Sequence, residues 1–215
     1  MTDYNVRANV QNELAWSPKL NAGRIAVSAS NGAVTLTGQV GSYLEKWEAE
    51  AIAKRVYGVT GVANDLQVDY NGTSTRDTEL LLQAVQALKW NLEVPSGAIQ
   101  AAVVDGWITL SGRVTWNFQR KAAESAVRNL SGVKGLTDEI TLETQPAPKD
   151  VKQRIADALS RNAQLDARRI SVNTDGNTAV LDGSVKSWAE RDEAETAAWS
   201  APGVNMVKNN LEVNY

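Results

Sequence analysis

The feature that most constrains this chain is an internal repeat that runs over its whole length of 215 residues. Equivalent apolar and glycine positions recur after 74 residues and again after a further 71 residues. The matching sets are Leu14, Ile25, Gly38, Gly58, Val59 and Leu66, then Leu88, Ile99, Gly112, Gly132, Val133 and Ile140, then Leu159, Ile170, Gly183, Gly203, Val204 and Leu211. Residues 71–75 and 144–148 have linker composition. The repeat therefore predicts three domains, at residues 1–72, 73–146 and 147–215.

Each copy contains two segments that have the pattern of an amphipathic helix. In the first helix apolar residues recur every four positions, at residues 6, 10 and 14, 80, 84 and 88, and 151, 155 and 159. In a second, alanine-rich helix the stripe is Ala49, Ile52, Ala53 and Val56, then Ala123, Ala126, Val127 and Leu130, then Ala194, Ala197, Ala198 and Ala201. Ser42 with Glu45, and Ser187 with Glu190, predict capping boxes, whereas Trp116 with Gln119 lacks the cap hydroxyl.

Between the two helices of each copy, two short alternating runs predict a β-hairpin. Asn31 with Gly32 and Asp105 with Gly106 are strong hairpin turns, and the third copy is expected to shift its turn by one residue, to residues 175–177. An alternating run closes each copy, at residues 62–68, 136–142 and 207–213. The expected order is αββαβ three times, an α+β fold.

Composition excludes several kinds of function. The chain has 22 Lys and Arg against 25 Asp and Glu, a net charge of -3 that does not favour nucleic acid. Without Cys or His it cannot form a thiolate or imidazole metal site, a cysteine nucleophile or a Ser-His-Asp triad. We find no apolar run of signal-peptide or membrane-span length, so we expect the cytoplasm, or the periplasm if a signal peptide has been removed.

These motifs resemble the BON domain family of bacterial osmotic-stress and nodulation proteins, which is also described as transport-associated. The resemblance rests on the hairpin ending in Gly38 and Val40, the alanine-rich helix, and the closing strand with Asn64 and Leu66, each repeated in the other copies. Asp138 replaces the Asn in the second copy, and Met206 replaces a Gly in the third. The resemblance implies two helices on a small three-stranded mixed sheet, a noncatalytic role, affinity for phospholipid surfaces, and an osmotic-stress or envelope setting.

Recurring glycines and polar residues are expected to be structural. Gly38, Gly112 and Gly183 lie at the end of the second strand. We expect that a neighbouring element leaves no room for a Cβ there, or that the backbone has a conformation that other residues rarely adopt. Asn64, Asp138 and Asn209 are short polar groups suited to satisfying a neighbouring turn. The pairs Lys46 with Glu50, Arg120 with Glu124 and Arg191 with Glu195 are expected to lie on solvated helix faces.

The tryptophans and arginines supply the candidate binding residues. Trp16 and Trp90 are equivalent, whereas Trp47, Trp107, Trp116, Trp188 and Trp199 each occur in one copy and are interpreted mainly as contacts between domains. Trp107 is expected to be exposed. With Arg168 and Arg169 of the arginine-rich third copy, it is our candidate for contact with membrane phospholipid or a protein partner.

Two other functions compete with this hypothesis. A potassium-like cation could be bound by oxygens near Asn64, Asp65 and Asp69, because a family member that also carries a LysM module binds potassium. An enzyme with paired carboxylates is not expected, nor is a cofactor. A partial calcium-loop pattern at residues 171–176 is interpreted as part of a hairpin.

Overall fold

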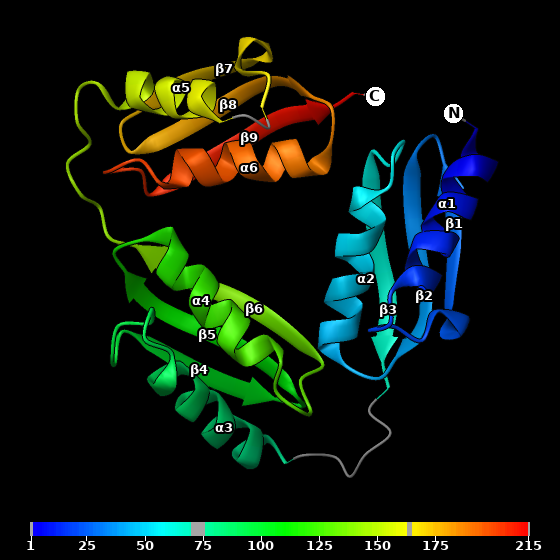
Figure 1. The fold of residues 1–215 in the computed structure, drawn as a ribbon. Coiled ribbons are helices and arrows are strands. Elements are labelled where there is room, and N and C mark those ends of the chain that lie inside the picture. The colour runs from blue at the N-terminus through cyan, green and yellow to red at the C-terminus, as the bar shows by residue number, and fades with distance from the viewer. Residues whose placement is uncertain (1, 70–75, 163–164, 215) are drawn as a thin grey trace. The chain divides into compact units, whose positions relative to one another are not determined.

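Each sequence repeat folds as a separate sandwich of two helices on one face of a three-stranded sheet (Figure 1). The computed structural model describes residues 2–69, 76–162 and 165–214. This confirms the predicted α+β class and the αββαβ order. The predicted domain boundary at residues 72 and 73 lies outside the described residues. The one at residues 146 and 147 lies in a segment without helix or strand.

The bounds of the elements follow the sequence repeat closely. Repeat 1 contains α1 (Asp3–Trp16), β1 (Ile25–Ser30), β2 (Ala33–Val40), α2 (Tyr43–Arg55) and β3 (Gly61–Val68). Repeat 2 contains α3 (Asp77–Trp90), β4 (Ile99–Val104), β5 (Trp107–Val114), α4 (Asn117–Arg128) and β6 (Gly135–Leu142). Repeat 3 contains α5 (Val151–Arg161), β7 (Ile170–Asp175), β8 (Thr178–Val185), α6 (Trp188–Trp199) and β9 (Met206–Val213). Short 3₁₀ turns, η1 (Ala22–Arg24) and η2 (Ala167–Arg169), precede β1 and β7.

The hairpin strand that follows the turn is the central strand of each sheet. The strand orders are β1-β2-β3, β4-β5-β6 and β7-β8-β9. In repeat 1, β1 pairs antiparallel with β2, and β2 pairs parallel with β3. Repeat 3 has the same pairing, with Leu181 opposite Asn209 as Leu36 is opposite Asn64. The parallel pair requires a crossover, which α2 and α6 supply across one face of their sheets.

The third hairpin corrects one expectation. Asn31 and Gly32, like Asp105 and Gly106, both have positive φ, as a two-residue turn of the I′ kind requires. In repeat 3 Asp175 pairs with Thr178, so the turn is at Gly176 and Asn177, the equivalent place. The predicted shift of the turn is therefore wrong, and only the glycine moves, from the second to the first turn position.

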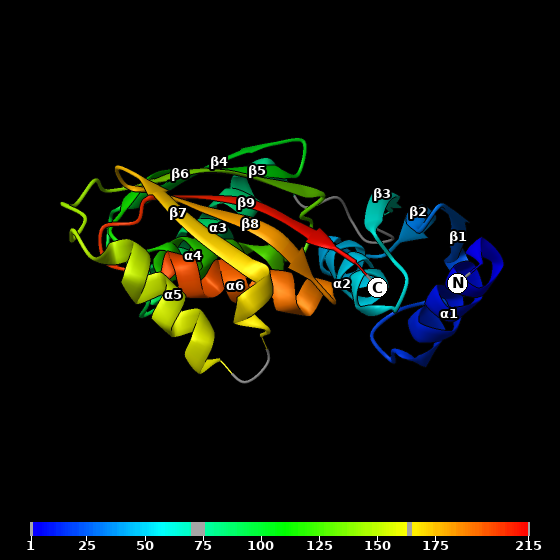
Figure 2. The ribbon, with the colours of Figure 1, turned by 90° about the horizontal axis from the view of Figure 1, so that it is seen from above.

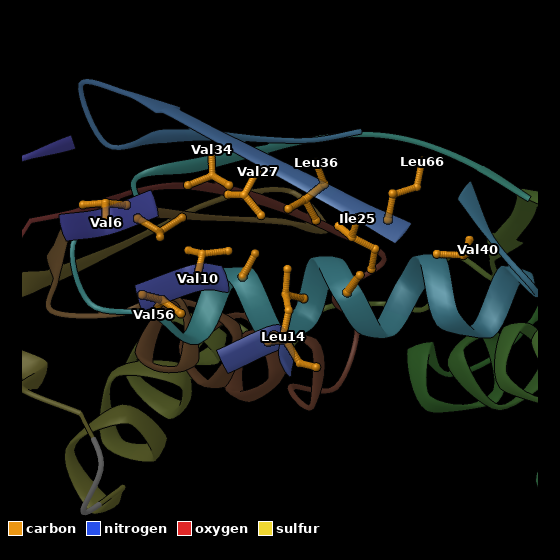
Figure 3. Packing of buried hydrophobic residues seen from close by; sticks show 14 residues of the cluster. Val6, Val10, Leu14, Ile25, Val27, Val34, Leu36, Val40, Val56 and Leu66 are labelled. Carbon is orange, nitrogen blue, oxygen red and sulfur yellow. The ribbon is translucent and has the colours of Figure 1, made fainter. Parts of the chain in front are cut away.

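The core of each repeat lies between the sheet and its two helices. In repeat 1 Val6, Val10 and Leu14 of α1 meet the inward side chains of the strands, such as Leu36 (Figure 3). Ile52 of α2 belongs to the same buried cluster. Burying a side chain such as Leu contributes roughly 1.5–3 kcal/mol. In repeat 3, α5 and α6 lie on the same face of their sheet (Figure 2). The predicted apolar stripes of the first helices are buried in all three repeats.

Capping starts the second helices as predicted in repeats 1 and 3. The Oγ of Ser42 accepts from Glu45 N at 3.2 Å, and that of Ser187 accepts from Glu190 N at 3.1 Å. In repeat 2, Gln119 Oε1 instead accepts from the backbone N–H of Trp116 at 3.0 Å. Repeat 2 thus lacks the capping hydroxyl, but the Gln119 side chain still accepts from a backbone N–H at the start of the helix.

Candidate functional site

The recurring Asn of the last strand joins that strand to the second helix. Asn64 Nδ2 donates to Lys46 O at 2.9 Å and to Glu50 Oε2 at 3.2 Å, and its Oδ1 accepts from Leu66 N at 3.4 Å. In repeat 3 Asn209 makes the equivalent bonds. Its Nδ2 donates to Arg191 O at 3.4 Å and to Glu195 Oε2 at 2.8 Å, and its Oδ1 accepts from Leu211 N at 3.2 Å. We call this set of bonds the helix–strand latch.

The recurring cation of the second helix belongs to the same latch. Lys46 Nζ donates to Leu66 O at 2.7 Å. Arg191 donates through Nε to Leu211 O at 3.2 Å and through Nη2 to Asn209 O at 2.7 Å. The expectation of a merely solvated ion pair with the acid four residues on is therefore wrong for these two residues. Their charged groups satisfy strand carbonyls.

Repeat 2 has a different set of side chains at the latch positions. The equivalent residues are Arg120, Glu124 and Asp138, all half-buried. An acid thus replaces the amide at Asp138. The latch residues contribute to the packing of each repeat, so their recurrence does not require a ligand.

The three recurring glycines have a conformation and a location that exclude other residues. Gly38, Gly112 and Gly183 have φ of 123°, 140° and 126°. A Cβ on Gly38 would lie 2.1 Å from Arg24 O, and one on Gly183 would lie 2.1 Å from Arg169 O. Both the positive φ and the close carbonyl require glycine here.

Trp107 lies flat on the open face of the second sheet rather than projecting from it. Its side chain is half exposed, at 50%. Its Nε1 donates to Thr137 Oγ1 at 2.8 Å, and its ring covers Gly135, where a Cβ would lie 2.3 Å from Cζ3. Together with exposed Val104 on the other side of the turn, it forms a small apolar area at the hairpin tip.

Arg168 and Arg169 both lie in η2, but only one of them is paired. Arg168 Nε is 3.1 Å from Asp166 Oδ1, and this hydrogen bond lowers the pKa of the Asp166 carboxyl. Arg169 is exposed, and its side chain makes no ion pair to the described residues. These arginines belong to repeat 3, whereas Trp107 belongs to repeat 2.

Two of the tryptophans that occur in a single copy have partners within their own repeat. Trp199 packs against the core of its own repeat, and its Nε1 donates to Glu195 Oε1 at 3.2 Å. The Arg191 guanidinium lies 5.3 Å from the centre of the Trp188 ring. Both aromatic side chains therefore have partners within repeat 3.

The most exposed tryptophans are the equivalent pair that the sequence analysis did not select. Trp16 is 86% exposed at the end of α1, and Trp90 is 75% exposed at the end of α3. Helical spacing could have shown this, because neither residue falls on the buried stripe of its helix.

An apolar surface surrounds Trp90 on the outer side of α3. Leu82 and Val85 are 61% and 49% exposed, and Leu92, just after the helix, is fully exposed. At 100° per residue, Leu82 points away from the buried Leu80, Ala84 and Leu88, and Val85 lies at the border between the buried stripe and the exposed side. We call Leu82, Val85, Trp90 and Leu92 the α3 surface.

Metal chemistry has little support in this arrangement. Among residues 2–69, 76–162 and 165–214, no group of three acidic side chains could hold a metal ion. Asn64 is engaged in the latch, and Asp69 Oδ2 is 3.3 Å from Arg24 Nη2. In the calcium-like segment Asn173 accepts from Lys152 Nζ at 3.1 Å, on a strand, as the hairpin interpretation predicts. The potassium-like alternative is therefore not favoured.

Comparison with known proteins gives three matches to one family within this chain. Residues 2–70, 76–144 and 149–215 each match the BON domain. Osmotically-inducible protein Y of Escherichia coli (strain K12) is 31% identical over 145 residues, which cover 65% of this chain and 72% of that protein. Outer membrane lipoprotein DolP of Haemophilus influenzae is 30% identical over 136 residues, 61% of this chain and 70% of that protein.

A solved structure also aligns along the whole chain. The C-terminal domain of CdsD, a structural protein of the type III secretion system of Chlamydia trachomatis, covers 100% of both chains at 15% identity. Its TM-score of 0.28 is too low to support an argument.

Proposed function

The chain belongs to the BON domain family, and from this premise we propose that it is a non-enzymatic, stress-associated protein that binds the surface of phospholipid membranes. The α3 surface carries the proposal. Leu82, Val85 and Trp90 of α3, and Leu92 just after the helix, expose large apolar side chains. Such a surface suits a helix that lies in the plane of a membrane interface.

The chemistry of the α3 surface fits an interface rather than the membrane interior. No described helix is long and apolar enough to cross a bilayer. Tryptophan favours the headgroup level, where its apolar ring and polar N–H are both accommodated. Lys89, next to Trp90 and exposed, would lie near lipid phosphates. Since only this cation accompanies the apolar side chains, binding should depend weakly on salt.

The residues selected from the sequence take secondary roles in this proposal. Arg169, which is exposed and makes no ion pair with the part of the chain that the structure describes, adds attraction to anionic lipid, and Arg168 adds less because Asp166 holds it. Trp107 and Val104 offer a smaller apolar contact on the open sheet face.

The relatives support the setting of the proposal. One is named as osmotically inducible and the other as an outer membrane lipoprotein. We propose that this chain is likewise produced under osmotic stress, in the cytoplasm, with the periplasm as the alternative compartment. Immunoblots of cell fractions before and after an osmotic upshift test both points.

Vesicle flotation tests the membrane proposal directly. The full chain is mixed with neutral and anionic phospholipid vesicles, and its tryptophan emission is recorded in the same samples. We expect binding with a blue shift, reduced at least fivefold by the triple substitution Leu82→Gln, Val85→Ala and Trp90→Gln. Met206→Gln removes an exposed apolar side chain from repeat 3 and is the matched control.

Each outcome of the flotation has a defined meaning. Failure of the wild-type chain to float with either vesicle would overturn the membrane proposal and leave a protein partner for the α3 surface. Binding that the triple substitution does not change would place the contact elsewhere, with Arg169 and Trp107 as the next residues to replace.

A further inference from the structure

A groove of about 350 Å³ lies in repeat 3 between α5 and the end of α6. Its walls include the buried Ile155 and the small residues Ala158, Ala197, Ala201 and Pro202. Arg154 and Arg161 line the same groove from α5. The groove thus combines an apolar floor with cationic side chains, which is the makeup of a site for a small amphiphile.

The groove exists because repeat 3 has small residues where repeat 1 has large ones. The positions of Ala197, Ala201 and Pro202 correspond to Ile52, Val56 and Tyr57. In repeat 1 the Ile and Val side chains are buried in the core. In repeat 3 the alanines leave space that no other described side chain fills, since the groove is open.

The cations of the groove are also particular to repeat 3. Arg154 replaces Asn9 and Gln83 of the other repeats, and Arg161 replaces the tryptophans. The Arg161 side chain is exposed and makes no ion pair with the described residues. Arg154 Nε donates to Asp150 Oδ2 at 2.9 Å, and the two terminal amino groups of Arg154 can then donate to a ligand. The groove and its two arginines therefore occur together in repeat 3.

The groove has two guanidinium groups and two nearby carboxylates, those of Asp150 and Asp157, so an anionic head group would be held by hydrogen bonds from the arginines rather than by excess positive charge. Asp157 also lines the groove and offsets one guanidinium. Its Oδ1 accepts from Gln153 Nε2 at 2.8 Å. Arg154 and Arg161 are seven residues apart, about two helical turns on one face, so both long side chains can turn toward one head group.

We propose that this groove binds a monomeric anionic amphiphile, with its phosphate or carboxylate head held by Arg154 and Arg161 and its alkyl chain on the alanine floor. The site is separate from the α3 surface and belongs to another repeat. It therefore does not depend on the membrane proposal.

Calorimetry with the full chain tests the site, using octyl phosphate below its critical micelle concentration. Inorganic phosphate supplies the head alone and octyl glucoside the chain alone. We expect saturable binding of octyl phosphate only. Arg161→Gln should weaken it about tenfold by removing a charged hydrogen bond. Ala197→Ile, which restores the repeat 1 side chain, should weaken it at least tenfold by filling the groove.

Controls make each outcome decisive. Arg169→Gln removes an exposed arginine of the same repeat outside the groove and should change the affinity less than twofold. Ala201→Val is a second filling variant, and circular dichroism confirms that each variant is folded. Absence of saturable binding, equal binding of inorganic phosphate, or wild-type affinity in both folded filling variants would overturn the proposal.

Discussion

Repeats 2 and 3 present opposite chemistry on the outer side of their first helices. Where α3 carries Leu82, Val85 and Trp90, the equivalent residues of α5 are Gln153, Ala156 and Arg161. The inner sides are the same, since each helix buries three apolar residues against its sheet. The shared fold therefore determines the residues on only one side of each helix. The other side is free to acquire a separate function in each repeat.

The strongest test of the shared interior is a substitution at the recurring glycine near the end of the second strand. Gly183→Ala should destabilise the chain by at least about 3 kcal/mol, because a positive φ and a carbonyl 2.1 Å from the new Cβ act together. Gly112→Ala should have an effect of the same size. Urea unfolding followed by circular dichroism measures both.

The control for this substitution lies in the same repeat. Gly176 also has positive φ, but no atom lies within 4 Å of its Cβ position. Gly176→Ala should therefore cost only about 1 kcal/mol, the backbone penalty alone. Equal losses in Gly176→Ala and Gly183→Ala would show that the close carbonyl contributes nothing.

The helix–strand latch predicts the next largest effect. Asn209→Ala should lower the free energy of unfolding by about 2 kcal/mol, because it leaves the half-buried Glu195 and the Leu211 N–H without this partner. Asn210→Ala, next along the strand, loses only an exposed bond to Asp182 and should change stability by less than about 0.5 kcal/mol. If both variants unfold at the same urea concentration, the latch does not stabilise the repeat.

The outer surfaces can be exchanged to test whether they act independently of the fold. Gln153→Leu, Ala156→Val and Arg161→Trp place the residues of α3 on α5. If the α3 surface binds membranes, this variant has two such surfaces and should bind neutral vesicles several-fold more tightly than the wild type. Lys208→Leu adds an apolar residue to the exposed side of β9 and is the control. Equal affinities of the exchanged variant and the wild type would contradict a transferable surface.

The sequence predicted the parts of the molecule that depend on local pattern and repetition. The αββαβ order, the buried stripes and the Ser42 and Ser187 caps all depend on residues close in the chain. The latch could not be derived in this way. Asn64 and Lys46 are 18 residues apart, and only the crossing of α2 over β3 brings them together. The residue types were recognised, but their partners were not.

The contacts of the aromatic side chains were the least predictable property, for a physical reason. The exposure of Trp107 was predicted from its place after a turn and is confirmed, but the turn did not show that its ring covers Gly135 on the neighbouring strand. Trp199 occurs in one repeat only, and the sequence did not show that it packs against the core of that repeat. Such contacts depend on residues that are distant in the sequence, which periodicity does not report.

The smallest predicted effect concerns the two arginines of η2. The hydrogen bond from Arg168 holds the pKa of the Asp166 carboxyl below its ordinary value. Because the folded-state pKa is the lower one, any stability from this pair is present above the unfolded pKa and is lost as the pH falls through the folded pKa. The Arg168 side chain is exposed and that of Asp166 is half-buried, so water screens the pair and it shifts a titration curve rather than the stability of the fold.

Carbon-detected NMR titration of the Asp166 carboxyl measures this effect. In Arg168→Gln the pKa should rise toward its ordinary value, whereas in Arg169→Gln it should stay lowered, because only Arg168 contacts Asp166. The pairing also predicts a difference in membrane binding. If Asp166 holds Arg168, Arg169→Gln should reduce the affinity for anionic vesicles more than Arg168→Gln does. Identical titration curves in the two variants would remove the distinction between these arginines, and both would then be equally available to anionic lipid.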